Sequence, residues 1–298
     1  MNTRPEESAL HERAPAKVNL FLHVAGRRDD GFHDLESLVV FTAFGDEVSI
    51  SPSSALTLER SGPFAGDLPD NPEDDLCLRA ATKLAKAFGR APTARIFLIK
   101  NIPVASGVGG GSSDAAAVLR GLCRLWGLDV RDPRVIGIAE DLGADVPVCL
   151  NGAAACISGI GDVVDPLVQD PAFHMLLVNP NEALATAEVF GAFAGGTGVT
   201  DGLVDSVCAQ DSGTLLETIS ASRNDLAVAA RELCPVVESV LRALEQSPGC
   251  TLARMSGSGA TCFGIFPDAK SCQRAGAVIS KAHQAWWVCP TRTARLSE

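Results

Sequence analysis

The sequence lacks the residue spacings that mark a zinc site or a fold stapled by disulfides. It contains no CxxC, HxxxH or HExxH pattern, which excludes the common zinc frameworks and predicts no metal ligands in the protein. The ten cysteines are scattered along 298 residues, and a chain of this length does not need disulfides to be stable. No apolar run could span a bilayer, and residues 1–13 lack the apolar core of a signal peptide. We therefore expect a soluble protein of the reducing cytoplasm.

Basic residues are also scarce, and tyrosine is absent. The 25 Lys and Arg against 36 Asp and Glu give a net charge of −11, which repels nucleic acid and anionic membranes and predicts neither as a partner. A phosphate site would have to be built locally. Hydrophobic residues make up 46% of the chain and charged residues 20%, as in ordinary globular proteins, and the length favours two domains.

The hydrophobic pattern predicts strands and helices intermixed without regular βαβ alternation. Residues 13–61 contain three or four predicted strands, separated by turns such as RRDDG and FGDE. Later strands are predicted at residues 93–102, 173–178 and 286–290 and on either side of a glycine turn, MSGSGATC. Helices are predicted at residues 76–89, 115–128, 133–142, 185–193 and 269–283, with two more around residues 224–246. This order favours an α+β fold, divided into residues 1–165 and 166–298.

A glycine-rich loop lies between a predicted strand and a predicted helix. It runs from Pro103 to Asp114 as PVASGVGGGSSD, with glycines at Gly107, Gly109, Gly110 and Gly111. Such a loop can aim backbone N–H groups at an anion, and Ser112 or Ser113 can cap the helix or face a phosphate. The alternative is a flexible turn capped by serine. The loop is neither a Walker A motif nor a good dinucleotide fingerprint.

Two polar positions elsewhere are candidates for proton transfer. Strand alternation puts Lys17 and Asn19 on one face of the APAKVNLFLHV segment, and Asp145 follows a helix that ends at Gly143. A carboxylate near an ammonium group can accept a proton from a hydroxyl, while the lysine stabilises the charge that develops. Each also has a structural interpretation, because Lys17 could protect an edge strand and Asp145 could simply form a turn.

Two further segments have alternative interpretations. The segment RRDDG followed by Phe32 and His33 is either a charged hairpin turn or a stacking and hydrogen-bonding platform for a base. The turn at residues 255–260, MSGSGA, is either a hairpin bend or a wall of the phosphate pocket.

The chain resembles the GHMP kinase superfamily, which has three sequence motifs. In chain order, the corresponding segments are the Lys17 strand, the loop of residues 103–114 and the turn of residues 256–260. The resemblance covers most of the chain. It implies an N-terminal domain like domain 2 of ribosomal protein S5, a C-terminal ferredoxin-like domain, and ATP as phosphoryl donor. The segments around GFHDLES, LGADVPVCLNG and ARMSGSGATCF are similar to the branch that phosphorylates the 2-hydroxyl of a cytidine-diphospho sugar alcohol in the non-mevalonate route to isoprenoid precursors.

The resemblance also implies roles for individual residues. Asp145 would be the catalytic base and Lys17 its partner, with Asn19 orienting the substrate. The ATP phosphates would bind the loop through Pro103, Gly107, Gly109, Gly110, Gly111, Ser112 and Ser113, and Lys100 is a further candidate nucleotide contact. Phe32, His33 and Phe190 would hold the cytosine. Mg²⁺ is implied by the chemistry, since it neutralises the β- and γ-phosphate oxygens.

Two positions depart from the pattern of the family. Phe32 stands where relatives usually have Tyr, so the stacking face remains and a hydroxyl contact is lost. Asp75 replaces a common Asn, so the side chain lacks the amide that the resemblance implies near the adenine. Three rival interpretations are a superfamily kinase for homoserine, mevalonate or a sugar, an RNA-binding module with an S5-like fold, and a nucleotide sensor without catalytic activity.

Overall fold

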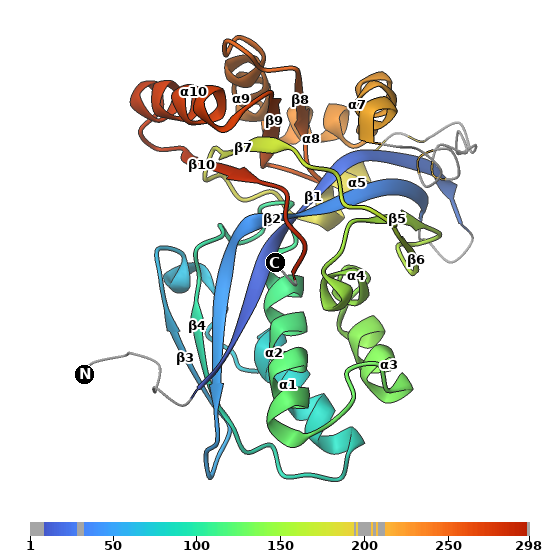
Figure 1. The fold of residues 1–298 in the computed structure, drawn as a ribbon, viewed down its shortest axis with the longest axis vertical. Helices are drawn as coiled ribbons and strands as arrows, with labels where there is room; N and C mark the ends of the chain where they lie inside the picture. Colours follow the sequence, from blue (N-terminus) through green and yellow to red (C-terminus); the bar gives the residue numbers. More distant parts are fainter. Residues whose placement is uncertain are drawn as a thin grey trace. The chain divides into compact units, whose positions relative to one another are not determined.

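The structure is a computed structural model that describes residues 9–28, 33–193, 195, 204, 207 and 212–296 (Figure 1). The chain forms two compact units, each assembled from several segments. The first unit contains Met1–Ala16, Gly45–Val104 and Gly109–Gly152, and the second contains Lys17–Phe44, Ala105–Val108 and Ala153–Glu298. Strands β1 (Leu10–Arg27) and β2 (His33–Ser51) each contribute residues to both units. The division of the sequence at residues 165/166 stays a prediction.

The first unit combines a small mixed sheet with helices. Its remaining elements are β3 (Thr57–Ser61), the 3-10 turn η1 (Ala65–Asp67), α1 (Leu76–Ala87), β4 (Arg95–Ile99), α2 (Gly110–Trp126), α3 (Pro133–Leu142) and α4 (Val146–Asn151). Strand β4 pairs antiparallel with residues 47–51 of β2 and parallel with β3. Helices α1, α2 and α3 pack against one another beside these strands (Figure 1), and α1 buries Ala80, Ala81 and Leu84 at helical spacing.

The second unit is built on antiparallel sheet. Its elements are β5 (Ala155–Ser158), β6 (Val163–Pro166), β7 (His174–Asn179), α5 (Thr186–Ala192), α7 (Ser212–Ala221), α8 (Ala227–Leu233), α9 (Val236–Glu245), β8 (Leu252–Met255), β9 (Cys262–Phe266), α10 (Ala269–Ala282) and β10 (Trp287–Arg292). One sheet has the order β10-β7-β9-β8, and α9 and α10 pack on its strands. Residues 37–39 of β2 pair with β5, which pairs with β6. The predicted α+β class is confirmed.

The turn predicted at FGDE is wrong, because β2 continues through it as one strand. A Cβ atom added at Gly45 would lie 2.4 Å from the Ala14 carbonyl oxygen of β1. Glycine is therefore required there for the close approach of two backbones and does not mark a turn. The next residue, Asp46, is a carboxylate buried within a strand, which needs a charged partner.

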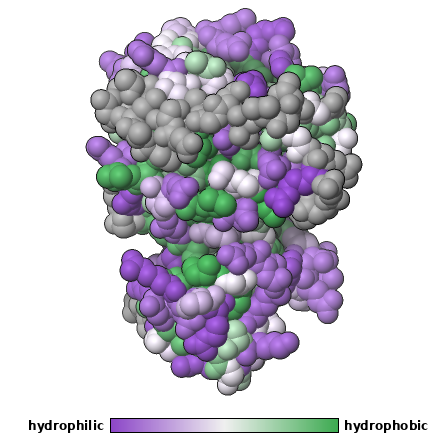
Figure 2. All heavy atoms as spheres, turned by 90° about the vertical axis from the view of Figure 1, so that its right-hand side faces the viewer, coloured by the Kyte–Doolittle hydropathy of each residue, from purple (hydrophilic) through white to green (hydrophobic). Residues whose placement is uncertain are grey.

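The surface mixes hydrophilic and hydrophobic side chains over the face seen in Figure 2. Large exposed apolar side chains among the described residues are distributed over several parts of the fold, with two of them in α8: Ile136, Val163, Val168, Val228, Leu233 and Val278. Scattered apolar residues of this kind are normal on a globular surface. Within the described ranges, no helix combines the length and the apolar character needed to cross a bilayer.

Candidate active site

The glycine-rich loop joins β4 to α2, and α2 begins inside the run of glycines. Gly109 is the N-cap residue, in a left-handed conformation with φ of 64°, and no side chain caps this end of the helix. The prediction that Ser112 or Ser113 caps the helix is wrong, because both lie within its first turn. The hydroxyl of Ser113 is buried and donates to the Pro15 carbonyl, with an O···O distance of 2.6 Å. The first N–H groups of α2 thus have no side-chain cap, as in anion-binding helix ends.

Within the second unit, the loop packs against the turn of residues 255–260. Gly107 has a φ of +76°, and a Cβ atom there would lie 2.5 Å from the Gly259 carbonyl oxygen and 2.7 Å from that of Ser256. The Thr261 N–H donates to the Ser106 carbonyl at 3.1 Å. The second glycine turn is therefore more than a hairpin bend, since it also supports residues 105–108 of the loop.

Lys17 and Asn19 both lie in β1 and are buried, with 4% and 5% of their surfaces exposed. The edge-strand interpretation of Lys17 is wrong, because a lysine that blunts an edge must reach solvent. The Lys17 N–H donates to the Val108 carbonyl at 2.9 Å, which ties β1 to the loop. The Asn19 N–H donates to Ser256 Oγ at 3.1 Å, so β1 also contacts the second glycine turn.

His33 and Phe190, predicted to hold the cytosine, lie together. His33 begins β2 and Phe190 lies in α5, and their ring centroids are 5.5 Å apart. Phe193 contacts the same imidazole edge-on at 6.1 Å. Both Phe190 and His33 are half-buried, so neither ring is fully enclosed by the fold. Phe32, the third predicted member, lies outside the described residues.

Asp145 occupies the N-cap position of α4 in the first unit and is half-buried. Its carboxylate does not cap the helix. A structural role as a capping residue therefore does not account for this aspartate. Its predicted role as catalytic base stays a prediction.

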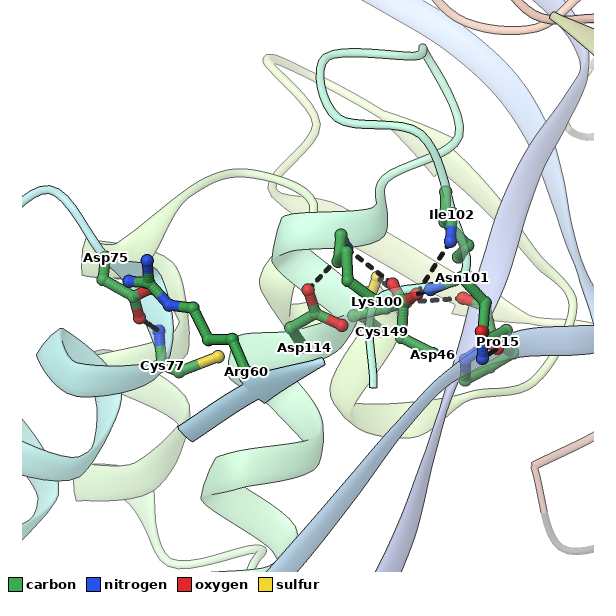
Figure 3. A network of polar contacts seen from close by, with 12 residues as sticks. Pro15, Asp46, Arg60, Asp75, Cys77, Lys100, Asn101, Ile102, Asp114 and Cys149 are labelled. Atoms are coloured by element: carbon green, nitrogen blue, oxygen red, sulfur yellow. Dashed lines mark hydrogen bonds and ion pairs between the residues drawn. The ribbon is translucent and has the colours of Figure 1, made fainter. Parts of the chain in front are cut away.

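Lys100, at the end of β4, is the centre of a buried charged cluster (Figure 3). Its Nζ atom lies 2.5 Å from Asp46 Oδ2 and 2.6 Å from Asp114 Oδ2. The other oxygen of Asp46 accepts from the N–H groups of Asn101 and Ile102, at 2.5 and 2.8 Å. The cluster therefore joins β2, the start of the loop and α2 through side chains that reach almost no solvent.

The charges in this cluster do not balance, and the pKa values reflect it. Burial opposes the charged form of Lys100, but Asp114 and Asp46 outweigh it and raise the pKa of the lysine. Burial raises the pKa of Asp114 to about 8, against the opposing effect of Lys100. Among the residues that the structure describes, Asp114 Oδ1 is buried and has no hydrogen-bond partner, which also favours a protonated carboxyl at this position.

Asp75 has a structural role. Its carboxylate caps α1 by accepting from the N–H groups of Cys77 and Leu78 at 2.8 and 3.0 Å. It also pairs with Arg60 at 2.6 Å. The N-cap and the ion pair use both carboxylate oxygens, so the position of Asp75 is fixed by the fold. A cavity of about 770 Å³ lies beside this pair, between β3 and α1, and none of the predicted site residues lines it.

Comparison with known proteins places these features in a family. The N-terminal domain of GHMP kinases matches residues 75–153, and the C-terminal domain matches residues 203–286. The 4-diphosphocytidyl-2-C-methyl-D-erythritol kinase of Rhodospirillum rubrum is 46% identical over 97% of this chain and 94% of its own length. That of Paramagnetospirillum magneticum is also 46% identical, over 94% and 96%. The chain belongs to the 4-diphosphocytidyl-2-C-methyl-D-erythritol kinase family.

Solved structures agree with this membership. A crystal structure of 4-(cytidine 5'-diphospho)-2C-methyl-D-erythritol kinase superposes with a TM-score of 0.77 and 30% identity, covering 96% of this chain and all of its own. A homoserine kinase from Cytophaga hutchinsonii superposes with a TM-score of 0.73 at 18% identity, over 99% of this chain and 97% of its own. The second likeness shows a shared fold. GHMP kinases use ATP as phosphoryl donor.

Several polar residues around the family motifs were not singled out from the sequence. The sequence places Asp46 in the predicted FGDE turn and Asp114 at the end of the glycine-rich loop, and neither position indicates a charged cluster. Ser37 ends the GFHDLES segment but received no role from it, and Asn224 lies outside the motifs. A carboxylate inside an apolar strand, as at Asp46, is the one signal available, since a buried charge requires a partner.

Proposed function

We propose that this chain transfers the γ-phosphoryl group of ATP to the 2-hydroxyl of 4-diphosphocytidyl-2-C-methyl-D-erythritol, in the non-mevalonate route to isoprenoid precursors. The observation that carries this proposal is near full-length membership of a family whose curated relatives bear the name of that kinase. The pairing of His33 with Phe190 supports a cytosine site, because a planar base binds well against aromatic faces.

In the proposed reaction, Asp145 accepts the proton of the 2-hydroxyl as its oxygen forms a bond to the γ-phosphorus. The bond between that phosphorus and the β–γ bridging oxygen breaks, and ADP leaves. Lys17 stabilises the negative charge that develops on the transferred group, and the loop of residues 103–113 holds the phosphates. Phosphoryl transfer depends chiefly on such positioning and charge stabilisation.

Mg²⁺ is proposed to enter with ATP. In the part of the chain that the structure describes, no three His, Cys, Asp or Glu side chains gather to hold a metal ion, so phosphate oxygens and water would supply most of its ligands. When bound, the ion neutralises the charge of the phosphates. A cytoplasmic location is consistent with the described cysteines, which are free thiols.

The experiment that tests the proposed function is phosphorylation followed by phosphorus NMR. The purified protein is incubated with ATP and Mg²⁺ in three parallel reactions. Each reaction contains one acceptor: the cytidine substrate, homoserine or mevalonate. We expect transfer to the cytidine substrate alone. Transfer to another acceptor would show that the protein is a kinase but would overturn the cytidine site. Binding of ATP without transfer to any acceptor would favour a nucleotide sensor.

The ring of Phe190 gives a prediction specific to the cytidine substrate. Phe190→Ala removes one face of the proposed base site and should weaken binding by about 1–3 kcal/mol, which is the usual contribution of one base–aromatic stack. We expect KM for the cytidine substrate to rise at least about fivefold, with KM for ATP unchanged. Steady-state kinetics with each substrate varied in turn measures both values. An equal rise for both substrates would contradict a stacking role.

A further inference from the structure

The side-chain amide of Asn19 is held in one orientation by a buried serine of the neighbouring strand. Ser37 lies in β2 and is fully buried. Its Oγ atom lies 2.6 Å from the Phe21 carbonyl oxygen and 2.7 Å from Asn19 Nδ2. A carbonyl oxygen can only accept, so the single hydroxyl hydrogen of Ser37 must point to Phe21. Toward Asn19, the Ser37 oxygen can therefore act only as an acceptor.

This polarity decides which end of the Asn19 amide faces Ser37. Only the NH₂ group can donate to an acceptor, so the Oδ1 atom must point the other way. Within the described residues, Oδ1 is buried and has no hydrogen-bond partner. It lies on the side of the second glycine turn, where a Cβ atom on Gly257 would come within 3.5 Å of it.

The backbone N–H of Asn19 is also held by a hydrogen bond whose direction is determined. Ser256 Oγ donates to the Gly107 carbonyl at 3.0 Å and therefore accepts from the Asn19 N–H at 3.1 Å. The glycine turn itself is held by Asn224, whose Nδ2 atom donates to the carbonyls of Met255 and Gly257, both at 2.8 Å. Main chain and side chain of Asn19 are thus both constrained, which leaves Oδ1 as a preorganised acceptor.

We propose that Ser37 is a positioning residue for substrate recognition, which orients Asn19 so that Oδ1 accepts a hydrogen bond from a hydroxyl group of the sugar alcohol. The inference rests on the proposed function for its substrate and on geometry alone for the orientation. A buried acceptor without a partner costs about 1–3 kcal/mol. A ligand that supplies the missing donor recovers this cost, whereas a ligand group without a hydrogen to donate does not.

The orientation is tested without any substrate. In a ¹H–¹⁵N spectrum, the Asn19 side-chain NH₂ signal is assigned as the one lost in Asn19→Asp. In the wild-type protein it should exchange slowly with solvent, because its donor is buried against Ser37, and in Ser37→Ala it should exchange faster or shift. Fast exchange in the wild-type protein, or no change in Ser37→Ala, would overturn the orientation, whether or not the protein is a kinase.

Kinetic measurements on variants of Ser37 distinguish a positioning role from a role in folding. Ser37→Ala should raise KM for the cytidine substrate about tenfold while KM for ATP stays unchanged, and Ser37→Thr, which keeps the hydroxyl, should restore at least part of the loss. Ser49→Ala is the matched control, because Ser49 is a buried hydroxyl in the same strand that bonds His11 at 2.9 Å. Unchanged KM in Ser37→Ala, or an equal rise of both KM values, would overturn the positioning role. An inactive wild-type protein would instead refute the proposed function.

Discussion

Replacing Asp145 by Asn should reduce kcat by about 10²–10⁴-fold, the usual contribution of a general base, while MgATP still binds. The amide keeps the shape of the carboxylate but cannot take the proton of the 2-hydroxyl. The fold should be retained, because Asn has nearly the same size and shape as Asp and is well tolerated at the N-cap position that this residue occupies. Steady-state kinetics measures kcat, and titration calorimetry measures the affinity for MgATP.

Asp141→Asn is the matched control for this experiment. Asp141 lies in the preceding helix, α3, is largely exposed and pairs with Lys83. Its loss removes a negative charge from the same region without touching the proposed base, so turnover should stay near the wild-type value. Near-normal turnover in Asp145→Asn would remove this residue from the mechanism. Equal losses in both variants would point to a general charge effect.

Replacing Lys100 by Met should lower the free energy of unfolding by about 3–5 kcal/mol, because it leaves buried carboxylates without their counterion. Asp46 and Asp114 both lie within 2.6 Å of the ammonium group, and the exposed fractions of all three side chains are 2% or less. Chemical denaturation of the wild-type and variant proteins measures the difference. The difference should shrink at lower pH, because burial raises the pKa of Asp114 to about 8 even beside Lys100, and removing Lys100 takes away the charge that opposes this rise.

Two further variants test the origin of this loss. Lys83→Met removes a lysine from an exposed ion pair and should cost less than about 1 kcal/mol. Combining Lys100→Met with Asp46→Asn and Asp114→Asn removes all three ionisable groups and should recover part of the stability. If Lys100→Met costs no more than Lys83→Met, the cluster does not stabilise the fold in the way its geometry indicates.

The sequence predicted those elements whose ends carry local signals. Helix α3 was predicted at the residues it occupies, with Pro133 at its start and Gly143 after its end, and the structure adds Asp132 as its N-cap. The continuous strand β2 was missed, because Gly45 has the composition of a turn and the reason for it lies in β1. The start of α2 was predicted too late, since glycine has low helix propensity and only the fold shows that Gly110 is helical.

The candidate site was predictable to a similar degree. Family motifs indicated His33 and Phe190, which the structure brings together. Ser37 ends the family segment GFHDLES, but the segment gives no role for it, because its importance depends on the direction of one hydroxyl hydrogen, which is fixed by a carbonyl in another strand. Local patterns reveal residue types suited to a reaction, whereas the residues that orient them become visible only from their contacts.

The interleaved composition of the two units has a consequence for dissecting the protein. The chain passes from one unit to the other five times, at Ala16–Lys17, Phe44–Gly45, Val104–Ala105, Val108–Gly109 and Gly152–Ala153. A C-terminal fragment beginning at Ala153 would lack Leu22 and Val24, which belong to the hydrophobic core of the second unit. This fragment would also lack Lys17, the proposed catalytic lysine, which belongs to the second unit. The N-terminal fragment would carry Lys17 but would lack most of the second unit. Truncation therefore cannot isolate either unit, and only co-expression of complementary fragments would supply all the segments that each one requires.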